Sequence, residues 1–184
     1  MRRLIYSMSI SLDGYINGPD GSFDWSAPDE ELHQFHNDQV RELGGHLLGR
    51  NLYETMTYWE AADPSWGPIE HDFDSLWQAL PKVVFSSTLS EVVGNTRLAS
   101  GDVVSEVRRL KQEPGADLGV GGAGLAAECI RAGLVDEFRP FVVPHVAGGG
   151  TPYLPKLDEG IPLRLLETHE FASRAVYMRF ELAG

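Results

Sequence analysis

Hydrophobic positions recur along this chain with two periods, one typical of strands and one typical of amphipathic helices. Short apolar runs bounded by glycine, proline and polar residues predict strands at residues 3–10, 46–48, 82–85, 117–120 and 138–146. Helical spacing and acidic first turns predict helices that begin near residues 28–31 and 49–51 and others at 73–80, 102–111 and 122–132. Because strands and helices alternate, the pattern favours an α/β fold with a mainly parallel central sheet.

The last quarter of the chain has a different pattern, with two runs of strict alternation after a glycine-rich loop. In the final run Val176, Met178 and Phe180 share one face, whereas Tyr177 and Arg179 lie on the other. We therefore expect an antiparallel hairpin appended to the parallel sheet.

The length and composition fit a single globular domain over residues 1–184. A formal charge of −12 argues against nucleic acid as a partner, because phosphate backbones are bound by clustered cations. The only cysteine, Cys129, has no partner for an intramolecular disulfide, and no apolar run reaches the length of a membrane span. The lone cysteine favours a reducing compartment, so we expect a cytoplasmic protein. His33 and His36 lack further clustered ligands, so we expect no metal site.

Residues 47–54 place a glycine and an arginine where a buried strand gives way to a helix. Free backbone N–H groups and the helix dipole stabilise phosphate at such a point, and Arg50 adds a charge-assisted hydrogen-bond donor. Gly49, Arg50 and Asn51 are therefore candidate phosphate-binding residues. The alternative is that Arg50 is an ordinary exposed residue after a strand.

A second glycine-rich segment, Gly-Val-Gly-Gly-Ala-Gly at residues 119–124, follows a predicted strand and opens a helix. It matches the dinucleotide-binding fingerprint in form. That fingerprint needs an acid at the end of the next strand, whereas Asp136 and Glu137 stand at the start of theirs. Three interpretations stay open: a Rossmann site, a glycine loop of another nucleotide site, or glycines that only form a turn.

The hydroxyls of Ser86, Ser87 and Thr88 follow the predicted strand 82–85. Taken alone, this segment is more typical of a turn, although hydroxyls at the carboxyl end of a strand can also contact a phosphate or a ribose. Carboxyl ends of parallel strands meet at one edge of a sheet. The three segments together therefore predict one crevice for a phosphate-bearing ligand.

The ordered set of motifs resembles the dihydrofolate reductase superfamily, most closely the reductase domain of the bacterial riboflavin deaminase/reductase. The motifs follow one another over nearly the whole chain, at residues 11–14, 48–54, 120–124, 134–137, 143–144 and 148–150. The resemblance implies a three-layer dihydrofolate reductase-like fold. It also implies an NADPH-dependent reductase that transfers a hydride to a C=N or C=O carbon of a small planar heterocycle, of pyrimidine or pterin type.

The resemblance further implies where NADPH binds. The implied residues are Gly49, Arg50 and Asn51 at the phosphates, Ser86 and Ser87 near the adenosine end, Gly121, Gly122, Ala123, Gly124 and Leu125 along the pyrophosphate, and Ile16 near the nicotinamide. A cis peptide between Gly121 and Gly122 is also implied. The alternative Rossmann site predicts a trans bond there and a preference for NAD.

The proton donor stays undecided between two acids. Counted from Trp25, Glu30 lies nearest the position where the resemblance places a substrate-holding carboxylate, and Asp13 is the other candidate. Glu30 also suits the first turn of any helix, and Asp13 also suits a turn before a glycine. Trp25 and Tyr53 either stack on a planar substrate or simply pack.

Two departures bear on the function. Riboflavin-pathway reductases commonly carry lysine after the Asp-Gly pair, whereas this chain has Tyr15, which puts a phosphorylated pyrimidine substrate in doubt. One cysteine cannot supply a deaminase zinc site. We therefore expect a stand-alone, homodimeric reductase with residues 11–28 as a candidate lid. The alternative is a non-catalytic nucleotide-binding or sensory protein that retains the NADPH crevice.

Overall fold

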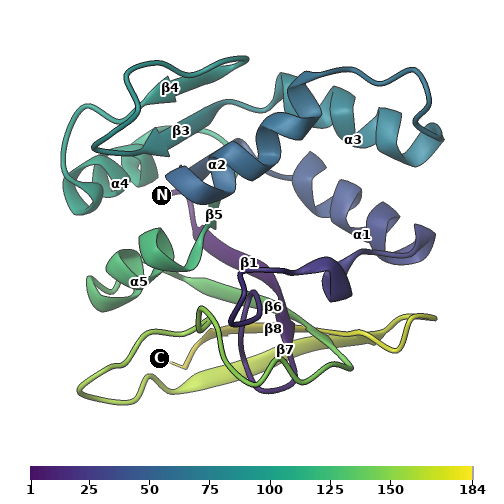
Figure 1. Ribbon diagram of the computed structural model, residues 1–184. Helices are drawn as coiled ribbons and strands as arrows, with labels where there is room; N and C mark the ends of the chain where they lie inside the picture. The colour runs from purple at the N-terminus through teal and green to yellow at the C-terminus, as the bar shows by residue number, and fades with distance from the viewer. Residues whose placement is uncertain (184) are drawn as a thin grey trace.

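The computed structural model describes residues 1–183 and contains one eight-stranded sheet with helices on both faces (Figure 1). The strands are β1 (Leu4–Ser11), β2 (Gly45–Gly49), β3 (Lys82–Phe85), β4 (Thr96–Leu98), β5 (Leu118–Gly121), β6 (Glu137–Val143), β7 (Leu163–Glu170) and β8 (Val176–Leu182). The α-helices are α1 (Glu30–Arg41), α2 (Arg50–Met56), α3 (Pro68–Ala79), α4 (Val103–Gln112) and α5 (Ala123–Arg131). Two short 3₁₀ helices are η1 (Asp24–Ser26) and η2 (Thr57–Glu60).

The strands lie in the order β4-β3-β2-β5-β1-β6-β8-β7. From β4 to β6 every neighbouring pair is parallel, and β8 and β7 continue the sheet in antiparallel fashion. The predicted α/β class, the mainly parallel sheet and the C-terminal hairpin are therefore confirmed. The order also brings the ends of β2, β5 and β1 side by side.

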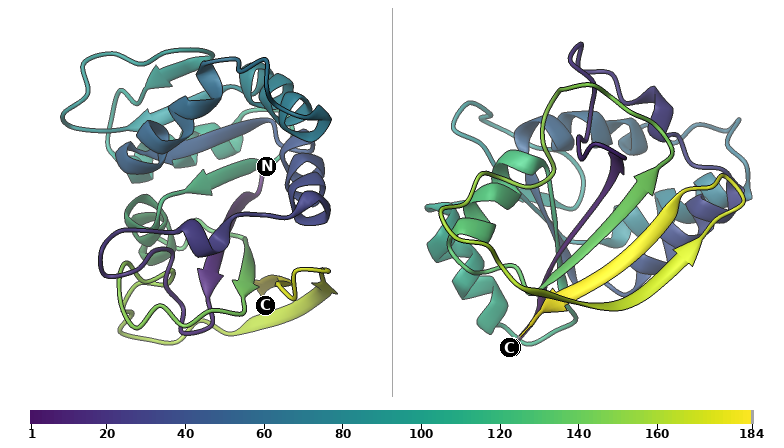
Figure 2. Two further views of the ribbon diagram at one scale, coloured as in Figure 1. Left: turned by 45° about the vertical axis from the view of Figure 1, so that its right-hand side comes forward. Right: turned by 90° about the horizontal axis from the view of Figure 1, so that it is seen from below.

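Each face of the sheet is covered by its own group of helices. Helices α4 and α5 pack on one face through the core that holds Val107, Leu110 and Ala126, whereas α3 covers the other through Phe73 and Trp77 (Figure 2). Local signals set where several helices begin. The Asp29 side chain caps α1 by accepting from the Leu32 amide at 2.9 Å, Asp102 caps α4 in the same way, and α3 begins with a proline.

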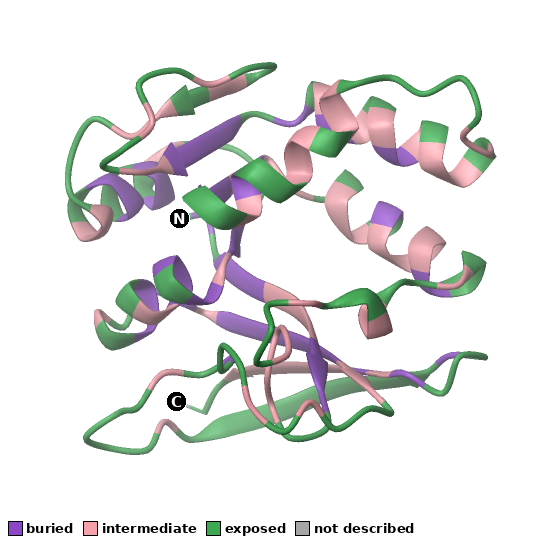
Figure 3. Cartoon of the chain, in the orientation of Figure 1, coloured by how far each residue is buried: buried purple, intermediate pink, exposed green. Residues whose placement is uncertain are grey.

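Several details differ from the sequence-based expectation. Strand β4 was not predicted, and α3 begins at Pro68 rather than at residue 73. Tyr177, expected on the polar face of β8, is 1% exposed because Phe35 of α1 packs on it with ring centroids 4.9 Å apart. Strand β7, at the edge of the sheet, is exposed along its whole length (Figure 3).

The described part of the chain has no helix long and apolar enough to cross a bilayer. Residues 1–183 also hold no group of three or more His, Cys, Asp or Glu side chains arranged for a metal ion.

A buried carboxylate joins the parallel strands to the C-terminal hairpin. Glu137 on β6 is fully buried and accepts from Arg3 at 2.9 Å, from Arg179 at 2.8 Å and from Arg139. Burial alone would raise the pKa of Glu137, but hydrogen bonds and charges from Arg179 and Arg139 outweigh it and hold the pKa below its ordinary value of 4.5. The ionised carboxylate therefore stabilises the fold.

We expect Glu137→Gln to lower the free energy of unfolding by about 3 kcal/mol at neutral pH, because the buried Arg139 and the partly exposed Arg3 and Arg179 lose their common counter-charge. Since the pKa is depressed, this contribution is fully present above about pH 4.5 and is lost as the pH falls through the folded-state value. Urea unfolding at several pH values measures the difference. Glu167→Gln is the control, because Glu167 is half exposed and lies 3.8 Å from Arg179, so its effect should stay below about 1 kcal/mol. An equal loss in both variants would contradict this account.

Candidate functional site

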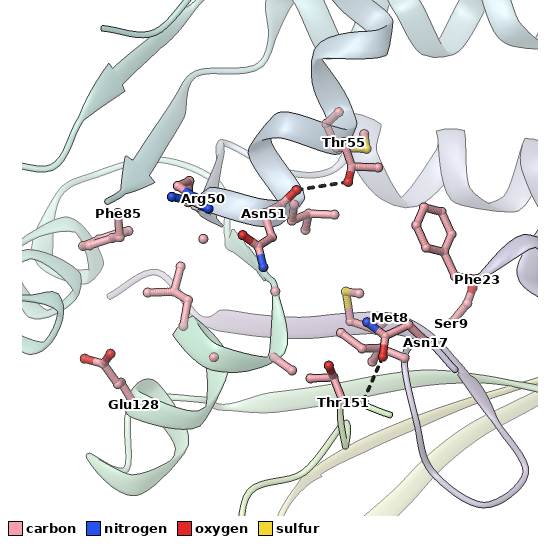
Figure 4. A pocket seen from close by; sticks show the side chains of 18 of the residues that line it. Met8, Ser9, Asn17, Phe23, Arg50, Asn51, Thr55, Phe85, Glu128 and Thr151 are labelled. Atoms are coloured by element: carbon pink, nitrogen blue, oxygen red, sulfur yellow. Dashed lines mark hydrogen bonds between the residues drawn. The ribbon is translucent and has the colours of Figure 1, made fainter. Parts of the chain in front are cut away.

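A cavity of about 610 Å³ opens at the carboxyl ends of the central strands (Figure 4). Its walls come mainly from β1, from the loop after β1, and from the helices α2 and α5. The lining residues include Met8, Ser9, Ile16, Asn17, Phe23, Ser26, Gly49, Arg50, Asn51, Leu52, Thr55, Met56, Gly122, Ala123, Gly124 and Leu125. The cavity therefore lies where the sequence predicts a crevice for a phosphate-bearing ligand.

The N-termini of α2 and α5 meet at this cavity. Gly49 precedes α2 and Gly122 precedes α5, and neither position offers a side chain to cap the following amides. Gly122 has a φ of +92°, and a Cβ there would lie 3.6 Å from the Gly49 nitrogen. Free backbone N–H groups at a helix start favour anions. The two glycines therefore leave the first amides of α2 and α5 uncapped at the same cavity.

The segment after β3 lies beside the same site. A second cavity of about 580 Å³, lined by Ser86, Ser87 and Thr88, shares Arg50 and Glu128 with the first. The Arg50 guanidinium donates to the Thr88 hydroxyl at 3.0 Å, and its Nε lies 3.6 Å from the Glu54 carboxylate. The structure therefore brings the three segments that carry the predicted phosphate-binding residues to one edge of the sheet. All predicted cofactor-binding residues except Ser86, Ser87 and Gly121 line the first cavity.

The first part of the predicted lid is fixed to a second loop. The Ile16 amide donates to the Thr151 carbonyl at 2.9 Å, and the Thr151 amide donates to Asn17 Oδ1 at 2.8 Å. Position 150, which lies against Asn17, has to be glycine, because a Cβ there would collide with the Asn17 carbonyl. Ile16 and Asn17 are therefore held at the cavity wall by backbone pairing rather than left on a free loop.

Neither predicted acid lines the cavity. Asp13 accepts from the Ala147 and Gly148 amides at 2.9 and 2.8 Å. Hydrogen bonds from the Ser11 hydroxyl and from these amides lower the pKa of Asp13 to about 2, so it stays ionised at neutral pH and ties two loops together. Glu30 lies exposed in the first turn of α1. Of these two carboxylates, neither stands where a proton donor to a bound ring would have to be.

The two predicted substrate-binding aromatics also lie outside the cavity lining. Tyr53 is 6% exposed within the core between α2 and α3, and its hydroxyl accepts from the Val93 amide at 2.9 Å. Trp25 stacks on His145 with ring centroids 5.0 Å apart. Phe23, Met8 and Met56 line the cavity instead. None of the three belongs to a motif, so the sequence alone indicates only that they are apolar.

The peptide between Gly121 and Gly122 is trans, so the implied cis bond is not present in this structure. The chain reverses direction there through the positive φ of Gly122.

Comparisons with known proteins agree with this architecture. The profile of the family described as "RibD C-terminal domain" matches residues 2–177. An uncharacterized protein of Bacillus subtilis, YyaP, is 31% identical over 186 residues, which cover 100% of this chain and 96% of that protein.

Two solved structures share the fold at low sequence identity. The diaminohydroxyphosphoribosylaminopyrimidine deaminase/5-amino-6-(5-phosphoribosylamino)uracil reductase of Thermotoga maritima superposes with a TM-score of 0.72 at 14% identity, over 99% of this chain and 57% of that protein. Dihydrofolate reductase of Enterococcus faecalis, complexed with NADP(H), superposes with a TM-score of 0.63 at 14% identity, over 99% and 97% of the two chains. The dihydrofolate reductase-like fold expected from the motifs is therefore confirmed.

Proposed function

The chain belongs to the RibD C-terminal domain family, and on that premise we propose that it is an NADPH-dependent reductase of a small planar heterocycle. The observation that carries the proposal is the meeting of three strand ends at one pair of adjoining cavities. Uncapped amides, hydroxyls and one guanidinium gather there. This set of groups suits a ligand with a pyrophosphate and a further phosphate.

The residues at these cavities fit NADPH in a consistent order. The amides of Gly122, Ala123 and Gly124 at the start of α5 would hold the pyrophosphate. Arg50, with the hydroxyls of Ser86 and Ser87, would hold the adenosine end and its phosphate. Ile16, fixed by its pairing with Thr151, would contact the nicotinamide. These groups support the proposal, because the pyrophosphate, the adenosine end and the nicotinamide would each have a residue to contact.

When bound, NADPH supplies a hydride from the C4 carbon of its nicotinamide. The protein's part is to position the acceptor ring against that carbon and to exclude water, for which Met8, Phe23 and Met56 provide apolar walls. Within residues 1–183, Glu128 is the only carboxylate that lines this cavity, and it lies on the same side of the cavity as Arg50 and Phe85, away from Met8 and Phe23 (Figure 4). The proton that accompanies the hydride would therefore come from water.

The wild-type protein is expected to bind NADPH saturably at micromolar concentration. A titration that follows the fluorescence of the cofactor measures the binding, and no saturable binding would reject the proposal.

Arg50→Ala is expected to weaken NADPH binding about tenfold, the effect of losing one charge-assisted hydrogen bond, and to weaken NADH binding less. Arg108→Ala, an exposed arginine of α4 outside both cavities, is the control. Equal losses for NADPH and NADH would contradict the role of Arg50.

A non-catalytic nucleotide-binding protein is the second candidate, and the absence of Asp13 and Glu30 from the cavity lining favours it. Single-turnover oxidation of bound NADPH separates the two. The reductase predicts that at least one of a panel of pterins, pyrimidines and quinones oxidises the bound cofactor faster than solvent does. If no compound accelerates oxidation while NADPH still binds, the sensory function is the better account.

A further inference from the structure

The cavity has two ends that differ in charge. Arg50, Phe85 and Glu128 lie at one end, and Met8 and Phe23 lie at the other, as the close-up shows (Figure 4). The first end is the one that the proposed function assigns to NADPH, so the inference below rests on that function. The far end is what remains for the second substrate.

The far end contains no cation. Among residues 1–183, Arg50 and Glu128 are the only charged residues that line this cavity, and both belong to the cofactor end. The proposed function assigns Arg50 to the adenosine phosphate of NADPH, and its guanidinium also donates to the Thr88 hydroxyl at 3.0 Å. A phosphate group on the second substrate would therefore have no positive partner.

The polar groups at the far end do not replace a cation. Asn17 Oδ1 already accepts from the Thr151 amide at 2.8 Å. The Ser26 hydroxyl donates to the Phe23 carbonyl at 2.7 Å and the Thr55 hydroxyl donates to the Asn51 carbonyl at 3.0 Å. The Ser9 hydroxyl and the Asn17 amide nitrogen are neutral donors, which suit a carbonyl or a ring nitrogen. A phosphate carries about −1.5 to −2 charges at neutral pH and requires charge-assisted donors in compensation.

The residue that precedes the cavity wall residue Ile16 supplies no cation either, because it is Tyr15. The backbone of Tyr15 forms an isolated antiparallel β-bridge with Pro152, and the Tyr15 amide donates to the Ser11 hydroxyl at 3.0 Å. Apolar walls without a counter-charge favour a neutral molecule.

We infer that the second substrate is an uncharged planar ring compound that carries no phosphate group. Phe23 offers the ring an aromatic face, and Met8 and Met56 offer polarizable thioethers. In the reaction a hydride passes from NADPH to a C=N or C=O carbon of the ring compound, the multiple bond becomes single, and water protonates the nitrogen or oxygen. NADPH is oxidised to NADP⁺ and the ring compound is reduced by two electrons.

Matched compounds with and without a phosphate test the inference on the full chain saturated with NADP⁺. The pairs are 5-amino-6-ribosylaminouracil, riboflavin and pyridoxal, each against its 5′-phosphate, with affinity measured by calorimetry. In every pair that binds, the form without phosphate is expected to bind at least about tenfold more tightly. A phosphorylated form that binds as tightly, or no binding by any member, would overturn the inference. Failure of NADP⁺ itself to bind, measured beforehand, would instead overturn the proposed function.

A charge added at Met56, the cavity-lining residue that follows Thr55 in the chain, provides the matched variant. Met56→Lys is expected to raise the relative affinity for the phosphorylated member of a pair about tenfold, whereas Met56→Leu, which adds no charge, should keep the wild-type preference. Thermal unfolding of both variants checks that they fold. An unchanged preference in a folded Met56→Lys protein would show that a missing cation does not set the selectivity, and would overturn the inference.

Discussion

The close approach of α2 and α5 at the ends of β2 and β5 is the constraint on which the site depends. Leu48 of β2 is paired with Gly121 of β5, so the two following helices begin side by side. A Cβ on Gly121 would collide with Leu52 of α2, and the positive φ of Gly122 turns the chain into α5. The glycines therefore fix both the reversal of the chain and the uncapped amides at one position.

The far wall of the cavity depends on loops that are joined by polar contacts. Asp13 binds the amides of Ala147 and Gly148, while Tyr6 and Tyr153 exchange hydrogen bonds between hydroxyl and carbonyl groups at 3.0 and 3.1 Å. Their rings stack with centroids 4.3 Å apart. The loop after β1 and the loop after β6 consequently form one wall. An acid that holds a loop in this way is not available as a proton donor.

The sequence predicted the parts of the molecule that follow from local rules. Alternating strands and helices predicted the parallel sheet, and a glycine or an arginine directly after a strand predicted the phosphate-binding edge, because strand ends of a parallel sheet meet there. Acidic residues in a first turn predicted where α1 begins, and the structure adds that the Asp29 side chain caps this helix.

The parts that were not predictable depend on long-range packing. The sequence left Tyr53 open between stacking on a substrate and packing, and only the folded chain shows that α2 directs it into the core, where its hydroxyl accepts from the Val93 amide. Phe23 and Met56 carry no motif, and only the folded chain shows that they share a cavity. The family resemblance placed Glu30 near a substrate, whereas the start of α1 leaves it exposed.

The central claim is that amides at the starts of α2 and α5 converge on one phosphate-bearing ligand, and amide chemical-shift mapping during addition of NADPH tests it most directly. The account predicts that the amide signals of Asn51, Ala123 and Gly124 shift together with a single dissociation constant, while those of Gly45 and Thr96 at the opposite ends of the strands stay in place. Saturable binding that moves the signals at the opposite ends and leaves those of α2 and α5 unchanged would contradict it.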